Sequence, residues 1–179
     1  GWRSVLVNNA GGSLGAELCR QCARHGARQI TLIEIDELAL LTTQNELRRD
    51  FPQIECLPVL GDCGDPAVIR HALSLSQPEA VFHAAAYKQV PVLESQLREA
   101  VRNNVLATAT VANEAQAAGV GTFVLISTDK AVDPVNVLGA SKRLAEMVCQ
   151  AMNSVEGTRF VTVRFGNVLD SAGSVVPLF

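Results

Sequence analysis

The residues best suited to chemistry follow an apolar, strand-like run at 123–126. They combine two hydroxyls, an acid and an amine, in the order Ser127, Thr128, Asp129 and Lys130. General acid–base catalysis uses these groups. After Pro134 the pattern predicts a helix that carries Leu138 and Lys142 four residues apart, and therefore on one face. The stretch is typical of a site that moves protons on a bound molecule.

A glycine-rich turn, Asn9-Ala-Gly-Gly-Ser-Leu-Gly15, lies between an apolar strand at 5–7 and a helix predicted for 13–25. In doubly wound folds, backbone N–H groups and a helix N-terminus bind a pyrophosphate at this point. We expect a cofactor to be bound by Gly12, Ser13, Leu14 and Gly15. Asn9 replaces the first glycine of G-x-x-G-x-x-G, and Asn tolerates positive φ, so we expect weakened binding rather than none. An ordinary tight turn is the alternative.

Three later stretches of the chain extend this cofactor hypothesis. Glu34 ends the strand predicted for 30–35, where an acid accepts hydrogen bonds from the adenosine ribose and repels a 2′-phosphate. This favours NAD over NADP, although Glu34 could also belong to a solvated strand end. Asp62 and Cys63 are further candidates for the cofactor site, where Asp62 could accept from the adenine amino group, and Asp65 could cap a helix. The small residues Ala84, Ala85 and Ala86 would let the backbone pass close to the cofactor.

Continuous apolar strands alternate with amphipathic helices along the chain. Strands are predicted for 5–7, 30–35, 54–60, 80–83, 122–126 and 159–165, and helices for 13–25, 36–49, 66–75, 93–118 and 135–153. The long helix would turn one stripe inward, formed by Leu97, Val101, Asn104, Val105, Thr108, Ala112 and Ala115. This pattern indicates an α/β fold with a parallel sheet covered on both faces, a Rossmann-type doubly wound domain over 1–179. His83 is interpreted as a packed residue at a strand end.

Composition excludes several classes of protein. The 179 residues carry a net charge of −3 without a basic run, which argues against nucleic-acid binding. No apolar stretch approaches the roughly 18 residues of a membrane span. Five irregularly spaced cysteines argue against a disulfide framework and for a reducing compartment. Cys19 and Cys22 lie within a predicted helix, with no second pair to complete a metal site, so we interpret them as structural thiols and expect no metal.

Five stretches in chain order resemble one enzyme group. They are Phe-His-Ala-Ala-Ala-Tyr-Lys-Gln-Val-Pro (82–91), Asn-Asn-Val-Leu (103–106), Ile-Ser-Thr-Asp-Lys-Ala-Val (126–132), Gly-Ala-Ser-Lys-Arg (139–143) and Arg-Phe-Gly-Asn-Val (164–168). The chain resembles extended short-chain dehydrogenases/reductases of the nucleotide-sugar 4,6-dehydratase group, the CapD/WbpM/PglF-like enzymes of bacterial polysaccharide synthesis. The resemblance covers nearly the whole chain.

The resemblance implies a lyase that, with bound NAD, oxidises C4 of a UDP-N-acetylhexosamine, eliminates water across C5–C6 and returns the hydride to C6. It implies that Asp129 protonates the C6 hydroxyl and that Lys130 removes the C5 proton. Ser127 or Thr128 would hold the C4 hydroxyl, and Lys142 would bind the nicotinamide ribose. Further contacts implied by the resemblance, to cofactor or substrate, are those of Lys88, Asn104 and Asn167.

Position 138 departs from the related dehydrogenases, which carry a catalytic Tyr there. A membrane-anchored branch of the group is similar in having an apolar residue, Met, at this position. The C4 hydroxyl proton would then pass to Lys142 through water, to Asp129, or to another group. We expect a cytoplasmic, homo-oligomeric part of a larger enzyme, with the C-terminal substrate-binding region missing and no activity by itself. An epimerase and a non-catalytic NAD-sensing domain are the alternatives.

Overall fold

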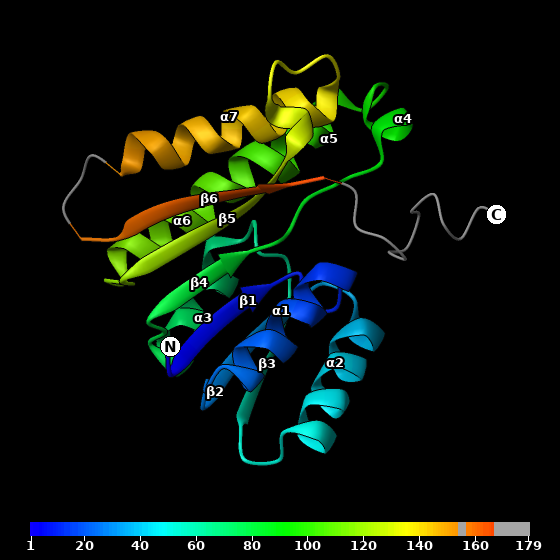
Figure 1. Cartoon of the computed structure of the whole chain (residues 1–179). Coiled ribbons are helices and arrows are strands. Elements are labelled where there is room, and N and C mark those ends of the chain that lie inside the picture. The colour runs from blue at the N-terminus through cyan, green and yellow to red at the C-terminus, as the bar shows by residue number, and fades with distance from the viewer. Residues whose placement is uncertain (154–156, 167–179) are drawn as a thin grey trace.

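The computed structural model describes residues 1–153 and 157–166, which fold around a six-stranded parallel sheet (Figure 1). The strands are β1 (Ser4–Asn8), β2 (Gln29–Glu34), β3 (Glu55–Leu60), β4 (Ala80–His83), β5 (Thr122–Thr128) and β6 (Arg159–Phe165). Their order is β3-β2-β1-β4-β5-β6, so the chain reverses its direction of winding between β1 and β4. In such sheets ligands bind beyond the carboxyl ends of the strands at this reversal. The doubly wound fold expected from the sequence is confirmed.

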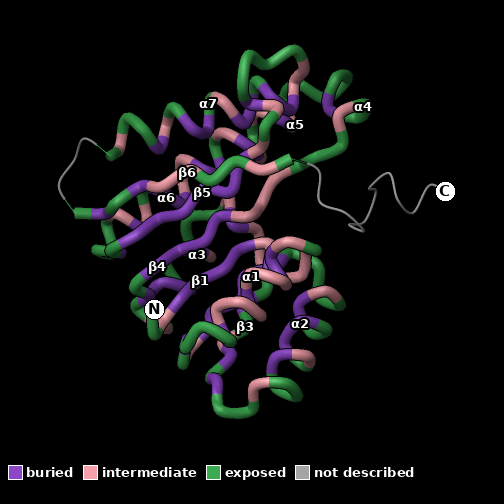
Figure 2. Tube along the Cα trace, viewed as in Figure 1, coloured by how far each residue is buried: buried purple, intermediate pink, exposed green. Residues whose placement is uncertain are grey.

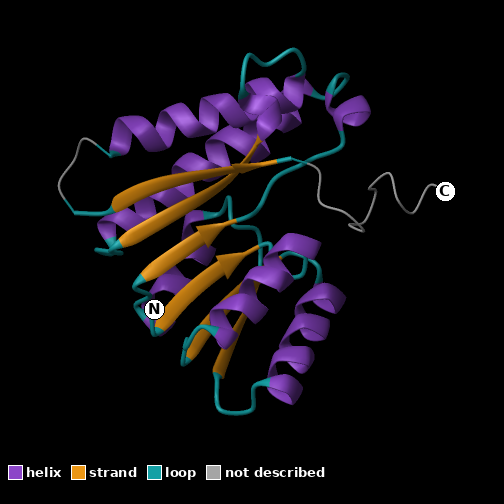
Figure 3. Ribbon diagram, viewed as in Figure 1, coloured by secondary structure: helices purple, strands orange, loops and turns teal. Residues whose placement is uncertain are grey.

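Helices cover both faces of the sheet, as Figure 3 shows. They include α1 (Ser13–Arg24), α2 (Glu37–Asp50), α3 (Pro66–Ser76), α6 (Ala107–Ala117) and α7 (Val137–Met152). Alternate side chains of a strand point to opposite faces, and in β1 Leu6 joins one apolar cluster while Val5 and Val7 join the other. Buried residues consequently run along the central strands (Figure 2).

The single helix predicted for 93–118 is wrong in detail. The chain forms α4 (Val90–Leu93), α5 (Leu97–Ala100), a π-helix η1 (Val101–Leu106) and then α6. Wider π-helical turns shift the residues before them to another face, so Leu97 is 62 % exposed. Of the expected inward stripe, Val101 and Val105 in η1 are half-buried, and the buried members are Asn104, Thr108, Ala112 and Ala115.

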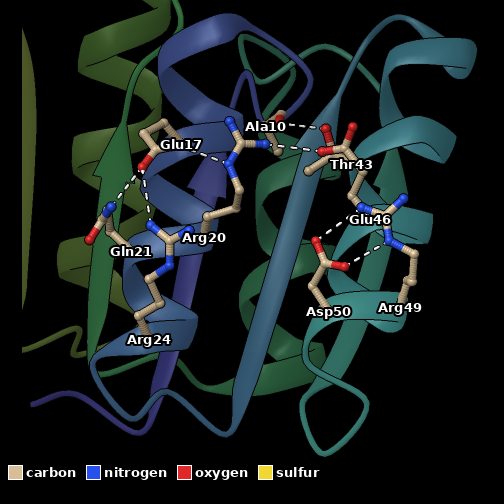
Figure 4. A network of polar contacts seen from close by, with 9 residues as sticks. All are labelled: Ala10, Glu17, Arg20, Gln21, Arg24, Thr43, Glu46, Arg49 and Asp50. Carbon is tan, nitrogen blue, oxygen red and sulfur yellow. Dashed lines mark hydrogen bonds and ion pairs between the residues drawn. The ribbon is translucent and has the colours of Figure 1, made fainter.

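Helices α1 and α2 are tied to each other and to the glycine-rich turn (Figure 4). The Arg20 guanidinium donates to Glu17 at 2.8 Å and to Glu46 at 3.0 Å, partly exposed pairs of the kind that contribute about 0–1 kcal/mol. The buried Thr43 hydroxyl donates to the Ala10 carbonyl at 3.1 Å. This bond fixes α2 against the turn that follows β1.

The cysteines are free thiols, as the sequence suggested. Cys19 is buried in the core, and burial raises the pKa of Cys22 to about 11, so this thiol stays protonated at neutral pH. Among the described residues, no three potential ligands form a metal-binding group, and no helix has the length and apolar character needed to cross a membrane.

Candidate functional site

The glycine-rich turn packs closely against the start of α1. Asn9 has a φ of 52°, the left-handed conformation that its amide side chain was expected to tolerate. A Cβ on Gly15 would lie 1.9 Å from the Asn9 carbonyl oxygen, so a side chain here would push α1 away from β1. Gly12 caps α1 without a side-chain hydrogen bond to the first turn. The first-turn N–H groups can therefore serve an anion.

Glu34 lies beside this turn and is only 5 % exposed. One carboxylate oxygen accepts from the Gly11 N–H at 2.8 Å, and the other accepts from the Ile35 N–H at 2.9 Å. The alternative of a solvated strand end is therefore wrong for Glu34. Three backbone amides, including that of Asp36 at 3.1 Å, hold its carboxylate at the edge of a cavity.

The cavity has a volume of about 210 Å³ and lies beyond the carboxyl ends of β1 to β4. Besides Glu34, its lining includes four of the expected cofactor residues, Asp62, Cys63, Ala85 and Ala86. One Asp62 oxygen accepts from the Gly64 N–H at 2.8 Å. Asp65 has the helix-capping role considered for it and accepts from the Ala67 N–H at 2.8 Å. Sequence positions far apart thus meet around one hollow.

A buried polar network supports the wall formed by residues 84–86. The side-chain Oδ1 of Asn8 accepts from the N–H of Ala84 at 2.8 Å and of Ala85 at 3.1 Å, and its side-chain Nδ2 contacts His83 Nδ1 at 2.5 Å. His83 Nε2 lies 2.8 Å from the Thr108 hydroxyl. Burial lowers the pKa of His83 to about 3, so the ring is neutral at pH 7. His83 is a packed strand-end residue, as the sequence indicated, and Asn8 was missed.

The structure corrects the expected cofactor contact of Asn104. Its side-chain Oδ1 accepts from the Tyr87 N–H at 2.9 Å, and its side-chain Nδ2 donates to the Tyr87 carbonyl at 3.2 Å and the Ser141 hydroxyl at 3.0 Å. The side chain is fully buried. Asn104 therefore positions the segment that carries Tyr87 and the exposed Lys88, because its own hydrogen-bonding groups are engaged within the chain.

Thr128, Asp129 and Lys130 form a compact group at the carboxyl end of β5. The Thr128 hydroxyl donates to the Asp129 carboxylate at 3.0 Å, and Lys130 Nζ lies 3.5 Å from the same oxygen. The hydrogen bond from Thr128, followed by the Lys130 charge, lowers the pKa of Asp129. Asp129 is exposed and Lys130 half-buried, so both are accessible to a bound molecule.

The structure does not present Ser127 to this group, contrary to one of the two expectations for the C4 hydroxyl. Ser127 is 3 % exposed and donates to Glu146 at 2.6 Å. Burial alone would raise the pKa of Glu146, but hydrogen bonds from Arg164, Ser127 and Arg143 outweigh it and lower that pKa to about 2. The buried position of Glu146 was not predicted from the sequence, although its place beside the apolar positions of α7 indicated that it faces the core.

Lys142 and Leu138 both point into the protein from α7. Lys142 Nζ donates to the Ile126 carbonyl at 2.7 Å, and burial lowers its pKa to about 8. Leu138 packs with Leu93 and Ala100 in a small apolar cluster. Position 138 therefore carries no titratable side chain. Asn167 lies outside the described residues.

Comparisons with known proteins agree with this arrangement. A family model described as "Polysaccharide biosynthesis protein" matches residues 5–179. The chain is 46 % identical to the capsular polysaccharide biosynthesis protein CapD of Staphylococcus aureus over 99 % of its own length and 30 % of the relative's. It is 43 % identical to a UDP-glucose 4-epimerase of Rickettsia bellii and 32 % identical to a UDP-N-acetylglucosamine 4,6-dehydratase (inverting) of Campylobacter jejuni, covering 99 % of this chain and 52 % of each relative.

Solved structures share the fold. Pen from Bacillus thuringiensis is 31 % identical, with a TM-score of 0.88 over 98 % of this chain and 53 % of that one. DesIV, a dTDP-glucose 4,6-dehydratase from Streptomyces venezuelae solved with NAD and TYD, is 21 % identical, with a TM-score of 0.84 over 98 % and 60 %. The chain thus spans between about a third and three fifths of the length of these proteins.

Proposed function

This chain belongs to the family of polysaccharide biosynthesis proteins, and we propose that it is the NAD-binding part of a nucleotide-sugar 4,6-dehydratase that acts on a UDP-N-acetylhexosamine. The observation that supports the proposal most is the group of Thr128, Asp129 and Lys130, a hydroxyl, an acid and an amine, at the carboxyl end of β5. Elimination of water needs both a base and an acid, and Lys130 and Asp129 can supply one of each.

The site residues fit NAD. Gly15 leaves space only for backbone, the first turn of α1 is free of a side-chain cap, and the Glu34 carboxylate lies at the cavity where an adenosine ribose would place its hydroxyls. We propose that the turn from Gly12 to Gly15 binds the pyrophosphate and that Lys142 binds the nicotinamide ribose. The chemistry that bound NAD supplies is reversible hydride transfer.

The residues at β5 then have separate roles. Thr128, rather than the buried Ser127, holds the C4 hydroxyl of the sugar. The lowered pKa of Asp129 means that its carboxylate is ionised at neutral pH, so it must gain a proton before it can act as an acid. One proton passing from Lys130 to Asp129 across their 3.5 Å contact gives a neutral amine and a carboxylic acid. Lys130 then removes the C5 proton, Asp129 protonates the leaving C6 hydroxyl, and both groups return to their starting charges.

Lys142 is our candidate for the proton of the C4 hydroxyl. Its pKa of about 8, lowered by burial, gives an appreciable neutral fraction near pH 7–8, whereas Leu138 carries no titratable group. Because Lys142 Nζ is buried against the Ile126 carbonyl, the proton would reach it through a water molecule. Asp129 is the alternative acceptor.

Product analysis on the full-length protein tests the function. We expect a 4-keto-6-deoxy sugar from UDP-N-acetylglucosamine, and Lys130→Met should lower turnover by roughly 100- to 10,000-fold, the usual contribution of a general base. Arg70→Gln is the matched control, because Arg70 lies in an exposed ion pair on α3 and should leave turnover unchanged. A C4 epimer as the product would instead support the epimerase alternative, which the Rickettsia relative's name favours. Binding of NAD without turnover would support a sensing domain.

A further inference from the structure

The π-helix η1 (Val101–Leu106) directs consecutive polar residues toward the cavity beside Glu34. Arg102 and Asn103 line this cavity, and the next residue, Asn104, holds the backbone of Tyr87. Consecutive residues of an α-helix would be spread around its axis, whereas the wider turn of a π-helix brings them nearer to one side. Such π-helical segments are frequent at binding sites.

Arg102 lines the cavity and its guanidinium contacts two carboxylates. Its Nε donates to Glu99 at 2.9 Å, and its Nη1 lies 3.8 Å from the Asp62 carboxylate. The side chain is 50 % exposed, so these ion pairs are screened by solvent and can be exchanged for other contacts at little cost. Among the described residues that line this cavity, Arg102 carries the positive charge.

The remaining walls are suited to a flat, uncharged ring. Ile35 is 69 % exposed and supplies most of the apolar surface, whereas Ile33 is only 1 % exposed, and Gly61 adds backbone only. The Asp62 carboxylate at the rim can accept from an exocyclic amino group. A planar guanidinium in the same cavity can stack face to face on an aromatic ring, whereas the compact ammonium of Lys has no planar face to stack.

We propose that the guanidinium of Arg102 stacks on the adenine ring of the bound dinucleotide while Asp62 accepts from the adenine amino group. This inference rests on the proposed NAD site and adds Arg102 to it as a contact of the adenine ring. It makes η1 the element that recognises the base, whereas the glycine-rich turn and Glu34 recognise the phosphates and the ribose. In the complex Arg102 would contact the face of the base and Asp62 its edge.

Calorimetric titration of the protein and its variants with NAD, AMP and nicotinamide mononucleotide tests the inference. Arg102→Ala should weaken NAD and AMP binding by roughly 5- to 30-fold and leave nicotinamide mononucleotide, which lacks adenine, unchanged. Arg102→Lys should lose nearly as much, because an ammonium keeps the charge but not the planar face. The matched control is Arg98→Ala, an exposed arginine on α5 outside the cavity, which should bind all three ligands normally.

Several results would overturn the inference. Full AMP affinity in Arg102→Ala would show that no stacking occurs. Recovery of AMP affinity in Arg102→Lys, or an equal loss for nicotinamide mononucleotide, would indicate a charge contact with phosphate instead. Failure of the unaltered protein to bind NAD or AMP would overturn the proposed NAD site itself. Normal binding by the unaltered protein together with full affinity in Arg102→Ala would overturn only the role of Arg102. Unchanged melting temperatures would confirm that the variants are folded.

Discussion

The Glu34 carboxylate is held by three backbone amides before any ligand arrives, so its direction is fixed by the chain around it. A preorganised carboxylate can accept from ribose hydroxyls without first losing conformational freedom. The same charge is unfavourable for a ribose that carries a 2′-phosphate. We therefore propose that this one residue both recognises NAD and rejects NADP.

We expect Glu34→Gln to narrow the ratio of NADP to NAD dissociation constants by about tenfold. The substitution keeps an oxygen for the Gly11 N–H but removes the negative charge that repels a 2′-phosphate. Fluorescence titrations with both dinucleotides measure the ratio, and Glu37→Gln, an exposed acid in the first turn of α2, is the control. An unchanged ratio would mean that Glu34 does not face the ribose.

His83 makes stability depend on pH. Its folded pKa of about 3 lies below the ordinary value of 6.5, because the buried ring resists charging. Between these values the unfolded chain binds one more proton, so stability falls as pH falls, by roughly 1–2 kcal/mol between pH 6.5 and 5. His83→Gln should flatten this part of the curve while lowering stability at pH 7, as measured by urea unfolding. The slope should persist in His71→Gln, where the ring is exposed; an equal slope in His83→Gln would contradict the prediction.

At the scale of elements, the position of α7 relative to the turn at Asp129–Ala131 depends on one glycine. A Cβ on Gly139 would lie 2.1 Å from the Lys130 carbonyl oxygen, so α7 can approach the turn only where no side chain intervenes. The helix start is fixed by Asn136, which accepts from the Gly139 N–H at 2.7 Å, and by Glu94, which accepts from the Val137 N–H at 2.7 Å. The close approach of Gly139 to the Lys130 carbonyl therefore sets the distance between Lys142 and Lys130.

Gly139→Ala should therefore lower stability by roughly 1–3 kcal/mol, the typical cost of overpacking, even though Ala favours helix by up to about 1 kcal/mol. We also expect at least a tenfold loss of turnover in the full-length protein, because Lys130 must move. Gly121→Ala is the matched control, since its Cβ would lie 3.4 Å from the nearest atom, an ordinary contact. Thermal unfolding and a turnover assay measure both effects. A stabilised, fully active Gly139→Ala would refute the role of this contact.

At the scale of the whole molecule, the cavity is lined by segments that lie between residues 9 and 103 of the chain. Its walls come from the ends of β1, β2, β3 and β4 and from η1, so a ligand there contacts elements on both sides of the sheet's reversal point. Binding to the folded state alone stabilises all of these elements together. The effect is measurable without any substrate.

NAD at about 100 times its dissociation constant should stabilise the chain by about 2.7 kcal/mol, which corresponds to roughly 5–10 °C in melting temperature for a domain of this size. NADP at the same concentration should have a much smaller effect, because of the Glu34 charge. Differential scanning fluorimetry measures both shifts. Equal shifts from the two dinucleotides would contradict the assignment of Glu34, and no shift from either would contradict the NAD site.

Most of the fold could be predicted because its signals are local. Apolar runs such as 30–35 and 122–126 marked strands, and the glycine spacing ending at Gly15 marked the turn after the first of them. The prediction of one long helix at 93–118 was wrong where η1 interrupts it. A π-helix adds about one residue per turn, and this change is too small to see in the irregular spacing of the apolar residues. The cavity residues Glu34 and Asp62 were found because strand ends share one edge of a parallel sheet.

The sequence by itself determined the order of strands and helices along the chain, the glycine-rich turn after β1 and the identity of the acid and amine after β5, because each depends on neighbouring residues. Only the tertiary structure decided which polar side chains are engaged within the protein. Asn104 binds Ser141, and Ser127 binds Glu146, which also holds Arg164 of the next strand. These partners lie far apart in the chain, so no local pattern records them, and burial alone separates the groups that hold the site together from those that face a ligand.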